Sequence, residues 1–412
     1  MGSGTALAVI GGGASGLNAA IAAARCGEQV ILLEKNQQLG KKLLATGNGR
    51  CNLMNRNPAC YEGDRAFAEA VLGANPVETL EAWWHSLGLY LRYDPEGRGY
   101  PCTLMAQTVL EVLKAEIRRL GISVYTGIRI RDVRREGDGF LLKPEDGEAL
   151  RARRVILSTG GAAQPKLGGN RDAWPWLESM GHPMKSAQPS LTPLEALPKA
   201  VSGLAGLRIR GDILLETEGR TVQQEKGELL FTEDGISGIC VMQCSRNAVP
   251  GKSAVLLNTV SDLFQSPEEL LDELRRRGAL APEEGPVELL RGMIPAKMAY
   301  AVCKQAGLPL RGEKNRDLHP GELRRIADTA MAYRIPVTGK KDFDRAQVMA
   351  GGADCGLLDP ENMESRIQPG LHLTGELTNV DGGCGGYNLM YAVMSGLKAG
   401  WNRRNSGKDR IS

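Results

Sequence analysis

The feature that most constrains this chain is an apolar strand that leads directly into a glycine-rich turn. Residues 7–10 read Leu-Ala-Val-Ile, and the next six residues read Gly-Gly-Gly-Ala-Ser-Gly. A helix-like stretch follows, and then a second apolar strand over residues 30–33. Gly11, Gly13 and Gly16 have the spacing of a dinucleotide-binding turn, in which glycine permits the sharp bend, the approach of a pyrophosphate and the helix–strand contact. We therefore predict a Rossmann-like unit whose helix N-terminus binds a pyrophosphate.

An acidic residue ends the second strand and narrows the choice of dinucleotide. Glu34 lies about 20 residues beyond the turn, where a carboxylate accepts hydrogen bonds from the adenosine ribose. A carboxylate here disfavours a 2′-phosphate, so FAD or NAD fits better than NADP. The cofactor contacts predicted in this segment are Gly11, Gly13, Ala14, Ser15, Gly16, Glu34 and Lys35.

The loop after Glu34 favours FAD over NAD. Residues 40–52 read GKKLLATGNGRCN, a long run of glycines, cations and small polar side chains. An NAD-binding domain normally continues soon into another helix and strand, whereas a flavoprotein uses a long loop here to wrap over the ribityl chain and the flavin ring. Lys41 and Lys42 taken alone are better explained as a solvated basic turn, but the whole run is not. The contacts predicted here are Lys42, Leu43, Thr46, Gly47, Arg50, Cys51 and Asn52.

Glycine-rich turns also follow two later strands. Residues 155–157 form an apolar strand that ends in Ser-Thr-Gly-Gly, and residues 371–374 form another, followed by a second glycine-rich loop and a closing helix over residues 388–401. The N-terminus of that helix would favour negative charge on the pyrimidine edge of a reduced flavin. Taken singly, each turn could also be an ordinary strand end or connector. The further contacts predicted are Ile130, Thr159, Gly160, Gly161, Gly375, Glu376, Asp381, Gly382, Gly386, Tyr387, Asn388 and Leu389.

Four long segments together resemble one family. Residues 40–52 and 370–389, with the shorter segments 334–339 and 346–352, resemble the BaiN/YhiN-like FAD-binding flavoproteins, also described as aminoacetone oxidase-like. The resemblance spans nearly the whole chain. It implies FAD as the cofactor, and it includes reductases of 3-oxo-Δ4,6 bile-acid intermediates as well as amine oxidases. The two glycine-rich loops together with Glu34 predict that the FAD is bound non-covalently.

The predicted fold class is α/β, with a Rossmann-like FAD-binding domain built on a parallel sheet and an insertion that forms a β-barrel-like subdomain and a helical subdomain. Short strands separated by Gly and Glu over residues 208–216 and 227–232 favour a small antiparallel sheet or barrel. A capping box at Ser266 and helical runs at residues 295–306 and 322–333 follow. The predicted boundaries are 1–189 and 343–412 for the FAD-binding domain, 190–262 and 330–342 for the β subdomain, and 263–329 for the helical subdomain.

Composition excludes several other classes of protein. The chain of 412 residues carries 51 Lys and Arg against 48 Asp and Glu, a net charge of +3 that is too balanced to indicate nucleic acid or an anionic membrane. No apolar run approaches the roughly 20 residues that span a bilayer. The nine cysteines form no CxxC pair and the four histidines have no metal-ligand spacing, so we predict reduced thiols and no metal. We expect a soluble cytoplasmic protein with a small-molecule substrate, and we leave the oligomeric state open.

The expected reaction is the reduction of a C=C bond in a 3-oxo-steroid, bile-acid-like or other small organic substrate. Residues 160–169 do not repeat the dinucleotide motif, so NAD(P)H would have to dock transiently unless the substrate or another protein supplies the electrons. Tyr100 and Tyr387 are candidates for the acid that protonates the substrate, although either could be a packing aromatic. Tyr100 lies in a segment, residues 97–102, where many relatives have other residues. Cys384 is a further candidate, with no identified partner to activate it.

Three alternatives remain. The resemblance also allows an FAD-dependent amine oxidase. A tRNA-modifying flavoprotein shares this type of fold, but residues 398–410 contain only scattered cations instead of a basic tract. A flavin-binding sensor without enzymatic activity is the third alternative.

Overall fold

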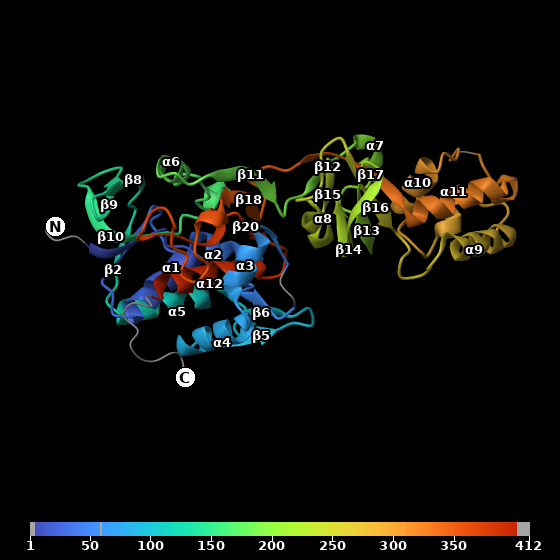
Figure 1. Ribbon diagram of the computed structural model, residues 1–412. Helices are drawn as coiled ribbons and strands as arrows, with labels where there is room; N and C mark the ends of the chain where they lie inside the picture. The colour runs from blue at the N-terminus through green and yellow to red at the C-terminus, as the bar shows by residue number, and fades with distance from the viewer. Residues whose placement is uncertain (1–4, 58–59, 311, 402–412) are drawn as a thin grey trace. The chain divides into compact units, whose positions relative to one another are not determined.

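The chain divides into two structural units, and both ends of the sequence build the first of them (Figure 1). The computed structural model describes residues 5–57, 60–310 and 312–401. By the contacts within the chain, the first unit combines Met1–Pro189 with Gln347–Ser412, and the second unit is Ser190–Ala346. Two parts of the predicted FAD-binding domain, residues 1–4 and 402–412, lie outside the described residues. Most of the segment 398–410, in which the sequence has only scattered cations, also lies outside them.

The second predicted boundary, after residue 342, lies too early. The backbone N–H groups of Arg345 and Ala346 both donate to the Asp342 carbonyl oxygen, at 3.1 and 3.0 Å. This turn therefore remains with the inserted unit, and the chain enters the first unit again at Gln347.

A mixed sheet forms the centre of the first unit. Its strand order is β7-β2-β1-β10-β9-β8, and β19 pairs with β10 outside this path. The strands β7, β2, β1, β10 and β19 are parallel, as predicted, while β8 and β9 form an antiparallel hairpin on the first half of β10. The bounds are β1 Thr5–Ile10, β2 Val30–Glu34, β7 Ser123–Thr126, β8 Ile130–Glu136, β9 Gly139–Pro144, β10 Leu150–Leu157 and β19 Leu371–Leu373.

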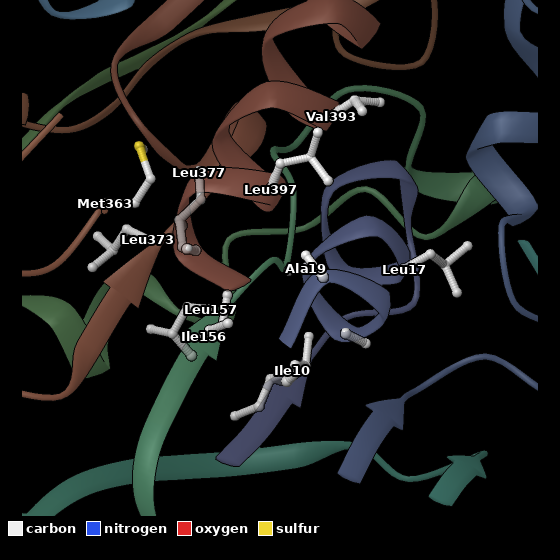
Figure 2. Close-up of a cluster of buried hydrophobic side chains, with 14 of the residues drawn as sticks. Ile10, Leu17, Ala19, Ile156, Leu157, Met363, Leu373, Leu377, Val393 and Leu397 are labelled. Atoms are coloured by element: carbon white, nitrogen blue, oxygen red, sulfur yellow. The ribbon is translucent and has the colours of Figure 1, made fainter. Parts of the chain in front are cut away.

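Two helices from opposite ends of the chain pack closely against each other beside this sheet. They are α1 (Ala14–Arg25) and α12 (Tyr387–Gly400). A Cβ on Gly396 would lie 2.3 Å from the Ser15 carbonyl oxygen, so only glycine permits this approach. Figure 2 shows the core that results, in which apolar side chains of both helices meet those of β1, β10 and β19. The labelled side chains are Ile10, Leu17, Ala19, Ile156, Leu157, Met363, Leu373, Leu377, Val393 and Leu397.

Smaller elements complete the first unit. A three-stranded antiparallel sheet has the order β3-β6-β5, and two further strand pairs are β20–β4 and β11–β18. The strand bounds are β3 Met54–Asn55, β4 Tyr61–Gly63, β5 Leu91–Tyr93, β6 Arg98–Pro101, β11 Met184–Ser190, β18 Val348–Ala353 and β20 Val380–Gly382. The helices are α2 Lys41–Ala45, α3 Arg65–Leu72, α4 Pro76–Ser86, α5 Ala106–Arg119 and α6 Trp174–Ser179.

A closed barrel of six strands forms the β part of the second unit, which confirms the predicted β-barrel-like subdomain. The order around the barrel is β12-β15-β14-β13-β16-β17. Its strands are β12 Leu194–Ala196, β13 Arg208–Thr217, β14 Arg220–Phe231, β15 Gly235–Ser237, β16 Ser253–Asn258 and β17 Tyr333–Lys340. The helices are α7 Pro198–Val201, α8 Ile239–Cys244, α9 Pro267–Leu280, α10 Ala296–Gln305 and α11 Pro320–Met331.

The ends of two predicted helices can be compared with the structure. The Ser266 side chain caps α9 by accepting the Glu269 N–H at 3.2 Å, which confirms the predicted cap. The run predicted to continue through Tyr333 was wrong at its end. Helix α11 stops at Met331, and Tyr333 begins β17 with its hydroxyl donating to the Ala200 carbonyl at 2.8 Å. The apolar periodicity of a helix cannot reveal that Tyr333 belongs to the next strand, where its hydroxyl makes a tertiary hydrogen bond.

A buried histidine in β19 makes the stability of the first unit depend on pH. Arg154 lies 3.2 and 3.4 Å from His372 Nε2, and the Asn362 carbonyl lies 2.9 Å from Nδ1. Because arginine only donates, Nε2 accepts and Nδ1 carries the proton, so the imidazole is neutral. Burial, and secondarily Arg154, lower the His372 pKa to about 4.

We predict that acid destabilises the first unit through His372. The imidazole of the unfolded chain binds a proton below about pH 6.5, whereas that of the folded chain stays neutral until the pH nears 4. The contribution of His372 to the stability of the first unit is therefore complete above pH 6.5. It is lost as the pH falls toward 4, by up to about 1.4 kcal/mol per pH unit. Urea unfolding at several pH values should show a smaller slope for His372→Gln. All five tryptophans belong to this unit, so their fluorescence reports on it. Burial also lowers the pKa of His182, but this residue is present in both the wild type and His372→Gln and adds the same slope to each. Equal slopes would contradict the assignment.

Candidate active site

The predicted dinucleotide turn connects β1 to α1, and two of its glycines are required by the fold itself. Gly11 has φ +108°, and a Cβ there would lie 2.3 Å from the Ser158 carbonyl oxygen. A Cβ on Gly16 would lie 1.9 Å from the Gly11 carbonyl oxygen. Any larger residue at these two positions would push apart β1, β10 and the start of α1.

Gly13 is different, because the protein's own packing gives no reason for glycine there. Its φ of −86° is open to any residue, and a Cβ would have no atom within 4 Å. Gly13 is the N-cap of α1, no side chain caps that helix, and its first turn contains no acidic residue. The N-terminus of α1 therefore faces open space with uncapped N–H groups, as a pyrophosphate requires. This geometry fits the predicted cofactor.

Glu34 is held against the turn by hydrogen bonds that the sequence only partly revealed. One carboxylate oxygen accepts the Gly12 N–H at 2.6 Å. The other accepts both the backbone N–H and the side-chain amide of Asn36, each at 2.7 Å. Carboxylate oxygens have further lone pairs, so a ribose hydroxyl could still donate to Glu34. Asn36 was missed by the sequence analysis because it belongs to no motif.

The surroundings of Glu34 contain several charged side chains. Burial lowers the pKa of Lys35, and the Arg129 guanidinium lowers it further, while Asp172 opposes both. Arg129 donates to both oxygens of Asp172 at 3.0 Å, and its buried Nε has no partner among the described atoms. Ile130, the next predicted contact, is 4 % exposed at the start of β8. These residues line the end of β2, where the adenosine of the cofactor is expected.

Glu376 joins three segments that the sequence analysis assigned separately to the cofactor site. Its carboxylate accepts from Lys42 Nζ at 2.6 Å, from the Met349 N–H at 2.7 Å and from the Gly161 N–H at 3.3 Å. Lys42 is therefore part of an ion pair and is not merely a solvated basic residue. The structure brings Lys42, Gly161 and Glu376 together as predicted neighbours. It also shows that the Glu376 carboxylate is already well supplied with donors.

The ends of the two later strands are joined by hydroxyl groups. Ser158 Oγ and Thr374 Oγ1 lie 2.7 Å apart at the ends of β10 and β19, directly before the predicted contacts Thr159, Gly160 and Gly375. The Gly375 N–H donates to Ser395 Oγ in α12 at 3.0 Å, and a Cβ on Gly375 would lie 3.0 Å from Ser15 Oγ. The turn after β19 is thus placed against the N-terminal turn.

The loop predicted to wrap over the flavin is built from residues in left-handed conformations. Gly47, Asn48, Gly49 and Cys51 have φ values of 56°, 54°, 81° and 59°. Thr46 Oγ1 donates to the Leu43 carbonyl at 2.6 Å and anchors the loop on α2. Burial raises the pKa of the Cys51 thiol to about 12, so this thiol is a packing group without nucleophilic character.

The same loop meets the C-terminal glycine-rich loop at a buried polar atom. Asn52 Oδ1 is buried and has no hydrogen-bond partner among the described atoms. A Cβ on Gly386, which has φ +103°, would lie 2.6 Å from this oxygen. A buried acceptor without a donor is costly, and a flavin N–H is a donor of the required kind. The amide of Asn52 therefore fits the ring of the predicted cofactor.

The C-terminal loop is less open than predicted. Its first residues, including Asp381 and Gly382, form β20, which pairs with β4. The Asn388 side chain accepts the Gly382 N–H at 2.8 Å and donates to the Gly382 carbonyl at 2.7 Å. Asn388 therefore closes the loop onto the start of α12, next to Leu389, and its amide is used within the protein.

The three candidate catalytic residues have different surroundings. Tyr387 is 8 % exposed, and its ring packs edge-on against Tyr61 with the centroids 6.0 Å apart. This is the environment of a core aromatic. The half-buried Cys384 has its sulfur 4.0 Å from Gln347 Oε1. Neither geometry presents an acid to a ligand.

Tyr100, on β6, lies beside the predicted flavin loop. A Cβ on Gly47 would lie 3.9 Å from the Tyr100 ring. Burial raises the pKa of its hydroxyl, while the nearby Arg98 and Arg50 lower it. Within residues 5–57, 60–310 and 312–401, this hydroxyl makes no hydrogen bond. The sequence analysis missed Arg98 because no motif surrounds it.

Two further findings concern only the described part of the chain. None of its helices combines the length and apolar character needed to cross a bilayer. It holds no group of three or more His, Cys, Asp or Glu side chains placed to share a metal ion.

Comparison with known proteins gives a consistent family. Residues 5–402 match the family model described as the HI0933-like protein Rossmann domain. The chain is 36% identical over 404 residues to a 3-dehydro-bile acid Δ(4,6)-reductase of Clostridium scindens, covering 96% of this chain and 98% of that protein. It is 26% identical over 393 residues to a ribosomal RNA dihydrouridine synthase of Escherichia coli, covering 94% and 95%. A 3-ketosteroid-Δ4-(5α)-dehydrogenase structure from Rhodococcus jostii is 16% identical, with a TM-score of 0.48 over 96% of this chain and 95% of that one.

Substitution of Gly13 should separate cofactor binding from folding. We predict that Gly13→Val leaves the thermal stability of the apoprotein nearly unchanged because the side chain enters open space. The same side chain should raise the Kd for FAD by about a hundredfold or more, since two or more hydrogen bonds of about 1.5–3 kcal/mol each would be lost. FAD titration and thermal melts of the apoprotein measure the two effects. Gly16→Ala is the control and should destabilise the apoprotein by about 1–3 kcal/mol. Full FAD affinity in Gly13→Val would refute the assignment of this turn.

Proposed function

This chain belongs to the HI0933-like family and is an FAD-dependent oxidoreductase, and we propose that it reduces a carbon–carbon double bond conjugated to a carbonyl group. The observation that carries this proposal is the 36% identity to a bile-acid Δ(4,6)-reductase, which extends over 96% of this chain and 98% of that protein. We propose a 3-oxo-steroid, a bile-acid-like molecule or a related small enone as the substrate.

The RNA-modifying relative supports the same reaction class by its chemistry. A dihydrouridine synthase saturates the bond between two ring carbons of uracil, and that bond is conjugated to a ring carbonyl. The names of both relatives therefore describe reduction of a carbon–carbon double bond conjugated to a carbonyl group. The RNA substrate remains a second candidate for this chain, because the similarity to the Escherichia coli protein covers 94% of it.

Different residues of this chain would have different roles in such a reduction. Bound FAD, once reduced, supplies the hydride that the β-carbon receives. We propose that Tyr100 donates the proton to the neighbouring carbon, since its hydroxyl is protonated at neutral pH and makes no hydrogen bond within the described residues. Arg98 and Arg50, which lower the pKa of that hydroxyl, would stabilise the phenolate that remains. The product gains one hydride and one proton, and the two electrons come from the cofactor.

The source of electrons is part of the proposal. The described residues contain one parallel sheet of the Rossmann type, and its β1–α1 turn is assigned to FAD. We propose that NADH or NADPH docks transiently to reduce the flavin, without a second dinucleotide-binding domain of its own. An amine as the electron donor would instead make the protein an amine oxidase.

The test is the anaerobic reoxidation of the reduced holoenzyme. We expect NADH or NADPH to bleach the flavin, and a 3-oxo-Δ4,6 steroid to restore its oxidised spectrum with reduction of one of its two double bonds. Tyr100→Phe should slow the second step by about 10²–10⁴-fold, the usual contribution of a positioned acid. The control is Tyr90→Phe, which removes a hydroxyl from a side chain that is 62% exposed and whose ring lies tilted against that of His85. It should react like the wild type.

Each contrary result has a definite meaning. Bleaching of the oxidised flavin by a primary amine would replace the reductase with an amine oxidase. Dihydrouridine formation in ribosomal RNA, with no reaction of any steroid enone, would favour the second candidate. Equal rates for Tyr100→Phe and the wild type would remove Tyr100 from the mechanism and leave the reaction class in place.

A further inference from the structure

One face of the small sheet β3-β6-β5 gathers polar and cationic side chains. In the antiparallel register, Arg92 of β5 lies opposite Tyr100 of β6, and Asn55 of β3 lies opposite Arg98 of β6. Directly paired residues and residues two apart in a strand share a face. Asn55, Arg98, Tyr100 and Arg92 therefore form a continuous row across the sheet.

The opposite face of the sheet carries Met54, Gly99 and Tyr93, which are neighbours across the three strands. Met54 and Gly99 are buried. On the first face Asn55 is buried, Arg98 and Tyr100 are half-buried, and Arg92 is exposed. The end of the row at Arg92 is thus accessible.

The row adjoins both loops assigned to the flavin. The Asn55 amide donates to the Gly385 carbonyl at 2.9 Å. A Cβ on Gly385 would lie 3.9 Å from Arg98 Cγ, and one on Gly47 would lie 3.9 Å from the Tyr100 ring. The outer face of the sheet therefore continues directly from the predicted flavin loops.

The charges on this face are not balanced. Arg98 is paired with two carboxylates, Asp94 at 2.6 Å and Glu96 at 2.9 Å, which together exceed its charge by one. Arg50 and Arg92 are exposed, and their side chains make no ion pair or hydrogen bond with any described residue. Arg92 lies opposite Tyr100 in the strand register, and Arg50 follows the Gly47 turn that adjoins the Tyr100 ring. Two guanidinium groups without an ion pair are therefore close to a tyrosine whose hydroxyl is also without a partner among the described residues.

We propose that Arg92 and Arg50 bind a carboxylate carried by the substrate, so that this enzyme reduces anionic enones in preference to neutral ones. The inference rests on the proposed enone reduction, and it adds the substrate class. An arginine fork matches the two oxygens of a carboxylate, and such charge-assisted pairs are stronger than neutral hydrogen bonds. The carboxylate would lie at the sheet, and the conjugated carbonyl would lie next to Tyr100.

The balance of charge favours a small carboxylate over a nucleic acid. Proteins that hold an RNA backbone neutralise many phosphates with an extended basic surface. This chain has a net charge of only +3, and on this face the described residues offer two unpaired cations. Two arginines suffice for one carboxylate.

The experiment compares an acid with its ester. The holoenzyme is assayed with a 3-oxo-Δ4 steroid that ends in a carboxylate, and with the methyl ester of the same steroid. We expect Arg92→Gln to raise KM for the acid by about tenfold or more while kcat and KM for the ester stay unchanged. Arg50→Gln should raise KM for the acid by a similar factor and, because Arg50 also stabilises the Tyr100 phenolate, should lower kcat for both compounds. Arg92→Lys keeps the charge and should recover part of the loss. FAD content and melting temperature are measured for every variant, because Arg50 is also a predicted cofactor contact.

The matched control is Arg134→Gln. Arg134 is exposed on β8 and makes no ion pair with any described residue, so this variant removes the same charge from another sheet. It should leave both KM values unchanged.

The outcomes separate the two proposals. Equal KM values for acid and ester, unchanged in Arg92→Gln and Arg50→Gln, would overturn the carboxylate site while leaving enone reduction in place. Failure of the wild type to reduce either compound would overturn the proposed function and this inference with it. If the variants lost binding of a uridine oligonucleotide and kept full affinity for the steroid acid, the arginines would belong to an RNA-binding surface and the carboxylate assignment would fall.

Discussion

The close approach of α1 and α12 is the contact on which the candidate site depends. It holds because Gly396 and Gly400 have no side chain: a Cβ on either would lie within 2.4 Å of a backbone oxygen in α1. This contact places the turn after β19 next to the turn after β1. The two glycine-rich loops, more than 300 residues apart in sequence, can then build one cofactor site. Hydrogen bonds from Gly375 to Ser395 and from Lys42 to Glu376 fix the same arrangement with polar groups.

Glycine serves two separate purposes in this site. Gly11 and Gly16 are there because strands and helix come too close for a side chain, and their loss would affect the protein with or without a ligand. Gly13 leaves space that no protein atom fills. Asn52 shows the same distinction among polar groups, because its buried oxygen has no donor among the described atoms, whereas Asn388 is satisfied by the loop it closes. Positions of the first kind report on folding, and positions of the second kind report on a ligand.

The sequence predicted those parts of the fold that follow from local pattern. The strand–turn–helix at Gly11, the parallel strands ending at Leu157 and Leu373, and the cap at Ser266 all depend on short-range chemistry, and the structure confirms them. The predicted β-barrel-like subdomain is confirmed as well, but the sequence could not predict the order of its strands, because closure depends on pairing between β12 and β17, far apart in the chain.

The site was predictable to the same extent. Motifs identified Glu34, Lys42 and Glu376, but not what each side chain contacts. The roles of three other residues depend on neighbours that only the folded chain brings near. Asn36 donates to Glu34, and cross-strand register places Arg92 and Arg98. The sequence alone gave no reason to prefer Tyr100 or Tyr387 as the proton donor. Burial and aromatic packing separate them, because Tyr387 packs in the core and Tyr100 lies beside the loop predicted to cover the flavin.

The discontinuous first unit also has a consequence for synthesis on the ribosome. Its central sheet lacks β19, and α1 lacks its packing partner α12, until almost the entire chain has been translated. The barrel and its helices are contiguous in sequence and can fold while the N-terminal segment still exposes apolar faces of β10 and α1. Nascent chains generally fold domain by domain, and exposed surfaces of this kind favour aggregation. Truncated translation products that lack α12 are therefore expected to be clients of chaperones.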